Sequence, residues 1–167
     1  TVKNDIPKTS FYNLIDLIKL KYENGSDVKK ELLLLQDHLN NSNNAHLEKI
    51  FILADKKFIG LENLKNDFDS SMKKYLKDYY NNKNDNIFYR YLSKFYSIEP
   101  NSTSSFTSDV LKNFSIIREK LHQKDIKSSL NYLSKIEGSD IYFEYWIKEA
   151  KNYLLFNKNL ILIQNNK

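Results

Sequence analysis

Glycine and proline are so scarce in this chain that few architectures other than a helical one are open to it. Only three Gly and two Pro occur in 167 residues. Folds built from β-strands need turn residues much more often, so this scarcity favours long helices joined by short connections. Hydrophobic residues make up 41% of the chain and charged residues 28%, which argues against disorder.

Apolar residues recur at intervals of three and four along almost the whole chain, which is the spacing of amphipathic helices. We therefore predict an all-α fold of about seven or eight helices in antiparallel hairpins, forming a bundle or a short helical array with no sheet. The predicted helices cover about residues 11–22, 27–39, 47–54, 61–80, 87–98, 110–121, 125–133 and 140–164.

Short sequence signals predict where some of these helices end. Asn24 and Gly25 predict the end of the first helix, and Gly138 predicts the turn before the last one. The polar stretch 101–105, which follows Pro100, is the best internal hinge. We therefore predict an N-terminal helical part over 1–100, ending in a basic aromatic amphipathic helix, and a C-terminal part over 101–167.

Residues that could perform chemistry do not come together in the sequence. The chain has no cysteine, which excludes thiol catalysis, disulfides and thiolate metal sites. His38 and His46 have no His, Asp or Glu three or four residues further along the chain, and Asp125, three residues after His122, belongs to the next predicted helix. None of the three therefore begins a ligand pair on one helix face, and Asp67 and Asp69 point apart on a helix. Glycine-rich phosphate-binding motifs are missing as well. We predict a non-enzymatic domain with no cofactor and no metal, which acts by contact.

Two observations concern membranes directly. No run approaches the roughly 18 apolar residues of a membrane-spanning helix, and no signal peptide is visible at Thr1. Because the chain does not begin with Met, we expect it to be a fragment, with room for a targeting or anchoring segment upstream.

The segment 73–98 combines positive charge with aromatic residues. Residues 71–100 include six cationic and three acidic side chains. A helical wheel over 87–98 separates an aromatic face from a face with Arg90 and Lys94, as in helices that lie in a membrane interface rich in anionic lipid. The predicted lipid-binding residues are Phe88, Arg90, Tyr91, Leu92, Lys94 and Phe95. A core helix is the alternative, and with only two Arg in the chain we predict no nucleic-acid partner.

The last predicted helix has more apolar residues than one buried stripe can hold. Trp146 lies on that stripe with Tyr142, Ala150 and Tyr153, so we predict that it is buried. Other apolar residues fall outside the stripe, and the tail 159–164 is expected to be uncovered and to bind a protein partner or a second copy. The predicted partner-binding residues are Phe156, Leu160, Ile161 and Ile163.

Several of these elements resemble, in their order and spacing, the mitofilin family. The stretch 125–138, with its Asp start and Leu-x-x-Leu core, runs into the motif Trp-Ile-Lys-Glu-Ala-Lys-Asn-Tyr-Leu at 146–154. Upstream, Glu31-Leu32-x-x-Leu35 and the segment 54–68 resemble elements of alphaproteobacterial members. The resemblance covers most of residues 11–164 through degenerate helical patterns.

This resemblance implies a role in membrane organisation. It implies an inner-membrane protein with an upstream span and coiled coil, and with this part in the periplasm, or in the mitochondrial intermembrane space of a eukaryote. Its implied function is a scaffold that shapes inner-membrane invaginations, binds anionic lipid and contacts an outer-membrane or scaffold protein. Residues 61–98 fill the place of the family's lipid-binding amphipathic helices, which favours lipid binding through 88–98. The alternative is a purely protein-binding helical adaptor resembling a tetratricopeptide domain.

Overall fold

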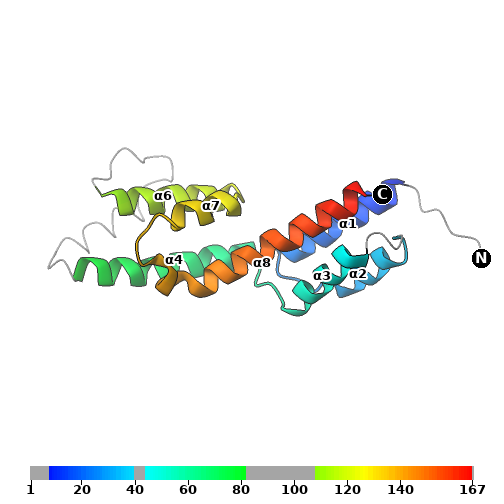
Figure 1. Ribbon diagram of the computed structural model, residues 1–167, viewed down its shortest axis with the longest axis horizontal. Coiled ribbons are helices and arrows are strands. Elements are labelled where there is room, and N and C mark those ends of the chain that lie inside the picture. The colour runs from blue at the N-terminus through cyan, green and yellow to red at the C-terminus, as the bar shows by residue number, and fades with distance from the viewer. Residues whose placement is uncertain (1–7, 40–43, 82–107, 167) are drawn as a thin grey trace, which may run out of the picture. The chain divides into compact units, whose positions relative to one another are not determined.

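The computed structural model describes residues 8–39, 44–81 and 108–166, and all the regular structure in these residues is helical (Figure 1). The helices are α1 (Lys8–Glu23), α2 (Lys29–Gln36), α3 (Asn44–Asp55), α4 (Leu61–Asn81), α6 (Asp109–His122), α7 (Ile126–Leu133) and α8 (Ser139–Asn165). The predicted all-α fold without a sheet is confirmed over this part of the chain. The predicted helix at 87–98 and the predicted hinge at 101–105 lie outside the described residues.

The chain divides into two compact units. Unit 1 consists of Thr1–Glu62 and Lys151–Lys167, and unit 2 consists of Asn63–Ala150. Helix α8 therefore supplies its first turns to unit 2 and its remaining turns to unit 1. The predicted boundary between residues 100 and 101 lies outside the described residues, so the division into 1–100 and 101–167 stays a prediction.

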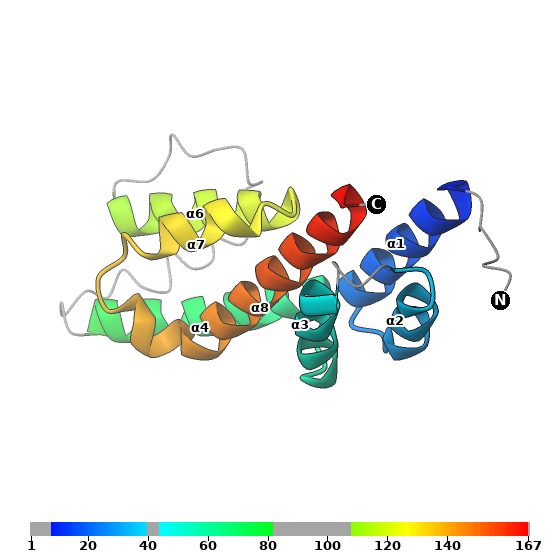
Figure 2. The ribbon, with the colours of Figure 1, turned by 45° about the vertical axis from the view of Figure 1, so that its right-hand side comes forward.

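Unit 2 is built around aromatic side chains from three helices. Figures 1 and 2 show α6 and α7 side by side, and α4 alongside the first turns of α8. The Phe68 ring of α4 lies 6.1 Å from the Phe114 ring, 5.1 Å from the Phe143 ring and 5.3 Å from the Trp146 ring. Trp146 is fully buried, as predicted, and its indole N–H donates to the backbone oxygen of Leu64 at 3.0 Å.

The buried positions of α8 differ from the predicted stripe. Phe143, Phe156 and Ile163 are fully buried although the wheel places them outside the stripe, whereas Tyr142 is only half-buried. A line of buried residues runs along α8 at intervals of three and four, and Glu149 and Asn159 are buried beside it: Ser139, Phe143, Trp146, Ala150, Tyr153, Phe156, Leu160 and Ile163 form the line. The backbone also leaves helical geometry at Phe143 (φ −112°, ψ 15°), so a wheel drawn for one straight helix misplaces this turn.

Unit 1 packs around a column of rings contributed by distant parts of the chain. The Tyr22 ring of α1 stacks on Phe156 of α8, with ring centres 3.5 Å apart, and on Phe58, 4.9 Å away. Phe58 in turn stacks on Tyr153 at 5.5 Å. Because Tyr22, Phe58 and Phe156 come from three separate segments, their rings join α1, the chain before α4 and the last turns of α8 into one core.

Two glycines allow backbone segments of unit 1 to meet closely. Helix α1 ends in a Schellman turn, in which Ser26 N–H donates to Lys21 O at 2.8 Å and Gly25 N–H donates to Tyr22 O at 2.9 Å. Gly25 takes the left-handed conformation that this turn requires, at φ +72°, and Gly60 has φ +87°. A Cβ on Gly60 would lie 3.0 Å from Asn24 C and Gly25 N, so the backbone contact itself requires glycine here.

Candidate protein-binding surface

The sequence predicts two contact sets, and the structure places only one of them. The predicted lipid-binding residues are Phe88, Arg90, Tyr91, Leu92, Lys94 and Phe95, and all of them lie outside the described residues. Their membrane contact therefore stays a prediction. The predicted partner-binding residues all lie in the part of α8 that belongs to unit 1.

The expected exposure of the tail 159–164 needs a correction. Phe156, Leu160 and Ile163 are buried in unit 1, whereas the Ile161 side chain is 53% exposed. The physical reason is that α8 has apolar residues on two faces, and the core of unit 1 covers one of them. Whether a partner binds at these four residues stays a prediction, but only Ile161 among them offers a largely exposed side chain.

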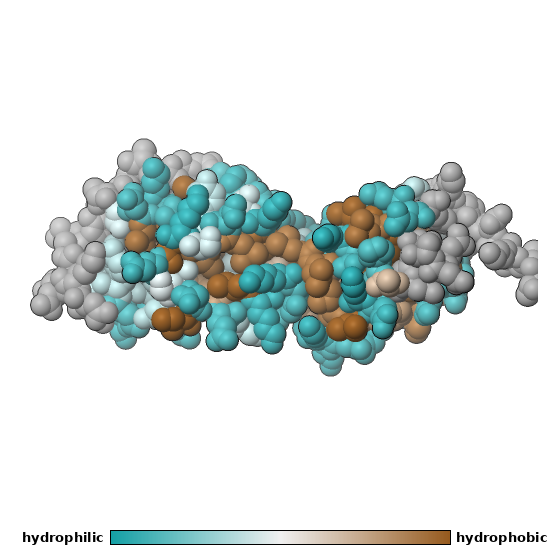
Figure 3. Space-filling model, in the orientation of Figure 1, coloured by the Kyte–Doolittle hydropathy of each residue, from teal (hydrophilic) through white to brown (hydrophobic). Residues whose placement is uncertain are grey.

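The other face of the same turns forms an exposed apolar stripe, which we call the α8 outer face. Leu155 is 44% exposed and Ile161 is 53% exposed, while Leu154 and Leu162 are half-buried. The α8 outer face consists of Lys151, Leu154, Leu155, Lys158, Ile161 and Leu162. At 3.6 residues per turn these positions fall within an arc of about 120°. Figure 3 shows hydrophobic side chains among hydrophilic ones over the C-terminal end of α8.

The charges of this surface have one sign. Lys151 and Lys158 are exposed on it, and no Asp or Glu occurs in the sequence from 150 to 166. A helix face of aliphatic residues with lysines between them is complementary to an apolar surface with carboxylates. Such a face can bind a partner.

A side-chain hydrogen bond fixes this helix against α3. The Nδ2 group of Asn159 donates to Leu155 O at 2.8 Å, which leaves the amide oxygen free to accept. His46 of α3 lies with its Nδ1 atom 2.9 Å from that oxygen, so Nδ1 is the protonated nitrogen and donates. The two residues are 113 positions apart in the sequence. No local spacing rule could have paired them.

A second buried hydrogen bond joins α8 to the end of α1. The Tyr153 hydroxyl donates to Glu23 Oε1 at 3.0 Å, and both side chains are buried. Burial of the phenol and the neighbouring Glu23 carboxylate raise the pKa of Tyr153 to about 12. Both causes disfavour the phenolate, so Tyr153 stays a neutral donor over the physiological range.

We predict that Tyr153→Phe lowers the free energy of unfolding by about 1–3 kcal/mol at pH 7, because the buried carboxylate loses a donor. The phenol pKa rises from about 10 in the unfolded chain to about 12 in the folded chain. The stability that Tyr153 contributes is therefore complete below pH 10 and is lost as the pH rises through about 12. Urea unfolding of both proteins should give a difference that is constant up to pH 10 and shrinks above it. A difference that grows in alkali would contradict this assignment.

A shallow pocket lies on the α2–α3 hairpin. It has a volume of about 360 Å³ and is lined by Gln36, Leu47, Glu48, Phe51 and Ile52. The Ile52 side chain is 53% exposed, and Leu33, which is 56% exposed, lies one turn before Gln36 on α2. We call this pocket and Leu33 the α2–α3 groove. Leu33 and Leu34 are exposed because one helix cannot bury the four consecutive leucines at 32–35 against a single core.

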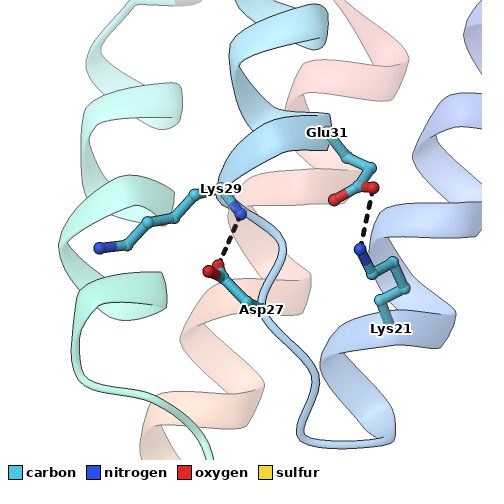
Figure 4. A network of polar contacts seen from close by, with 4 residues as sticks. All are labelled: Lys21, Asp27, Lys29 and Glu31. Carbon is cyan, nitrogen blue, oxygen red and sulfur yellow. Dashed lines mark hydrogen bonds and ion pairs between the residues drawn. The ribbon is translucent and has the colours of Figure 1, made fainter.

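Polar contacts hold α2 in place on both sides. Lys21 Nζ donates to Glu31 Oε1 at 2.9 Å, which joins α1 to α2 and keeps the pKa of Glu31 below its ordinary value (Figure 4). The backbone N–H of Lys29 donates to Asp27 Oδ1 at 2.9 Å at the start of α2. Lys29 Nζ lies 2.6 Å from Asp55 Oδ1, which links α2 to α3. Of these three contacts, the exposed Lys29–Asp55 pair is the one that joins the two helices of the groove.

The described ranges contain neither a cluster of metal ligands nor a helix that could span a membrane. No group of three or more His, Asp or Glu side chains in 8–39, 44–81 and 108–166 could hold a metal ion. None of the helices placed by the structure is both long enough and apolar enough to cross a bilayer. Asp67 and Asp69 have different neighbours, in α8 and in α6. Asp69 pairs with Arg118, with Oδ1 and Nε 3.2 Å apart. Burial, then the charge of Glu149 and then that of Asp67 raise the pKa of the Tyr145 phenol.

Comparisons of the chain with protein families, with curated proteins and with solved structures gave no match. The resemblance to the mitofilin family therefore rests on the sequence elements quoted above. The function has to be inferred from the surfaces themselves.

Proposed function

We propose that this chain is a protein-binding helical module and that the α8 outer face is the surface that contacts its partner. The observation that supports this most is the pair of opposite faces on one helix. The inner face is held by the Tyr22–Phe156 ring stack, by the hydrogen bond from Tyr153 to Glu23 and by that from His46 to Asn159. The outer face leaves Leu155 and Ile161 exposed on a helix that cannot turn them inward.

Exposed aliphatic side chains on a rigid helix are a common basis for protein recognition. A partner that covers Leu155 and Ile161 gains roughly 25 cal/mol for each Å² of apolar surface removed from water. Because the helix is already ordered, little conformational entropy is lost on binding. Lys151 and Lys158 contribute mainly to orientation and to the rate of encounter. The chemistry therefore favours a partner surface that is apolar and acidic.

Site-specific photo-crosslinking in the organism of origin tests this proposal. A photoreactive amino acid at Ile161, and separately at Leu155, should give a discrete adduct with another protein chain. The same group at Lys127, which is exposed on α7, serves as the matched control and should give no such adduct. Adducts from all three positions, or from none, would count against the α8 outer face as a binding surface.

We propose membrane organisation as the second candidate function, in the form that the resemblance to the mitofilin family implies. Its support is the amphipathic pattern of 87–98, with Arg90 and Lys94 opposite the aromatic face. In this proposal the domain lies in the periplasm or intermembrane space, at the surface of the inner membrane. The chain should sediment with liposomes that contain anionic lipid, and Arg90→Glu with Lys94→Glu should remove the dependence on that lipid. Wild-type chain that ignores such liposomes at low salt would leave the protein-binding function alone.

A further inference from the structure

Unit 1 has two exposed apolar surfaces of opposite charge. The α8 outer face has Lys151 and Lys158 and no carboxylate, as described above. Among the described residues that line the α2–α3 groove, Glu48 is the charged one. One surface is a convex helix face and the other is a hollow between two helices. In shape and in charge, each is a suitable partner for the other.

The size of the groove suits aliphatic side chains from a helix. Its volume of about 360 Å³ is near the lower end of the roughly 300–1,000 Å³ typical of ligand pockets. Leu47, Phe51 and Ile52 make its wall mostly apolar, and Gln36 and Glu48 supply the polar part. An amphipathic helix laid in an apolar groove is a recurrent mode of recognition, in which residues at intervals of three and four anchor the contact.

The spacing of the α8 outer face fits that mode. Ile161 follows Leu154 by two helical turns, with Lys158 between them on the same face. We propose that the α8 outer face of one copy of this chain docks in the α2–α3 groove of a second copy, with Lys158 opposite Glu48. This inference rests on the proposed function, since it names the partner of the α8 outer face as the same protein.

The contact joins two different surfaces, the α8 outer face of one copy and the α2–α3 groove of another, and this decides how copies assemble. Because the face and the groove are separate surfaces of one chain, each docked copy still has a free face at one end and a free groove at the other. The contact is heterologous, and copies add head to tail unless the rotation closes a ring. The surfaces are small and partly polar, so association is weak and shows at high protein concentration.

Sedimentation velocity over a wide range of concentration tests the proposal. The mean mass of the wild-type chain should rise with concentration. Ile161→Asp in the face and Ile52→Asp in the groove should each keep the chain monomeric. Both side chains are 53% exposed, so neither change should unfold the protein, and circular dichroism and thermal melting check this.

Mixing the two variants gives the decisive result. The Ile161→Asp chain keeps an intact groove and the Ile52→Asp chain keeps an intact face, so an equimolar mixture should form a dimer that grows no further. Lys158→Glu or Glu48→Lys alone should weaken wild-type association several-fold, and the two together should restore it. Lys127→Glu is the matched control and should have no effect.

Two outcomes would overturn the inference. One is a wild-type chain that stays monomeric at the highest concentration, and the other is a mixture of the two variants that remains monomeric although wild type associates. The crosslinking experiment separates this failure from a failure of the proposed function. Adducts with a different protein at Ile161, together with a monomeric wild type, would reject self-association and keep the binding surface.

Discussion

Replacing Trp146 by alanine should lower the free energy of unfolding by about 3–5 kcal/mol, the usual range for removal of a large buried aromatic side chain. Trp146 has no exposed surface, its ring packs edge-on against Phe68, and its N–H donates to Leu64 O. The variant loses the apolar burial, leaves a cavity that the neighbouring rings cannot fill and breaks this hydrogen bond. Urea unfolding followed by circular dichroism measures the loss.

Trp146→Phe separates two of these contributions. Phenylalanine keeps an aromatic ring against Phe68 but has no donor for Leu64 O, so we expect a smaller loss than for alanine. A change below about 1 kcal/mol for Trp146→Ala would contradict the packing described for unit 2, because a buried tryptophan cannot be removed at so little cost.

Gly60→Ala should destabilise the protein by more than about 2 kcal/mol. The left-handed conformation at φ +87° is less favourable for alanine than for glycine by about 1–2 kcal/mol. Its Cβ would also lie 3.0 Å from backbone atoms of Asn24 and Gly25, and backbone cannot move aside as a flexible side chain can. The two costs add, because one arises within the residue and the other arises from its neighbours.

Gly138→Ala is the matched control for this prediction. Gly138 also has a positive φ, +70°, but a Cβ there would meet nothing within 4 Å. Its replacement should cost only the conformational part. Chemical denaturation of both variants gives the difference directly. Equal losses would mean that the close contact between the backbones at Gly25 and Gly60 does not exist.

Local sequence signals predicted the helices of the described chain and much of its core. The end of α1 at Glu23 follows from Asn24 and Gly25, and the burial of Trp146 follows from its place among apolar residues at helical spacing. These features depend on residues within one or two turns. Local propensity and periodicity are therefore sufficient to find them.

The faces of α8 could not be predicted in the same way. Its sequence is apolar on two sides, and periodicity alone does not say which side the rest of the chain covers. The contacts that decide this come from far away, with Tyr22 against Phe156 and His46 against Asn159. The α2–α3 groove likewise needs two helices at a known separation. The partner-binding prediction consequently named three residues of the covered face and one of the exposed face.

The free energies of unfolding of two neighbouring variants test the central claim most directly. That claim is that α8 has an inner face that holds unit 1 together and an outer face that is free for a partner. Leu160 is buried and Ile161 is 53% exposed, although they are adjacent and both aliphatic. Leu160→Ala should cost about 2–5 kcal/mol, whereas Ile161→Ala should change stability by no more than about 0.5 kcal/mol. Equal losses, or a larger loss at Ile161, would contradict it.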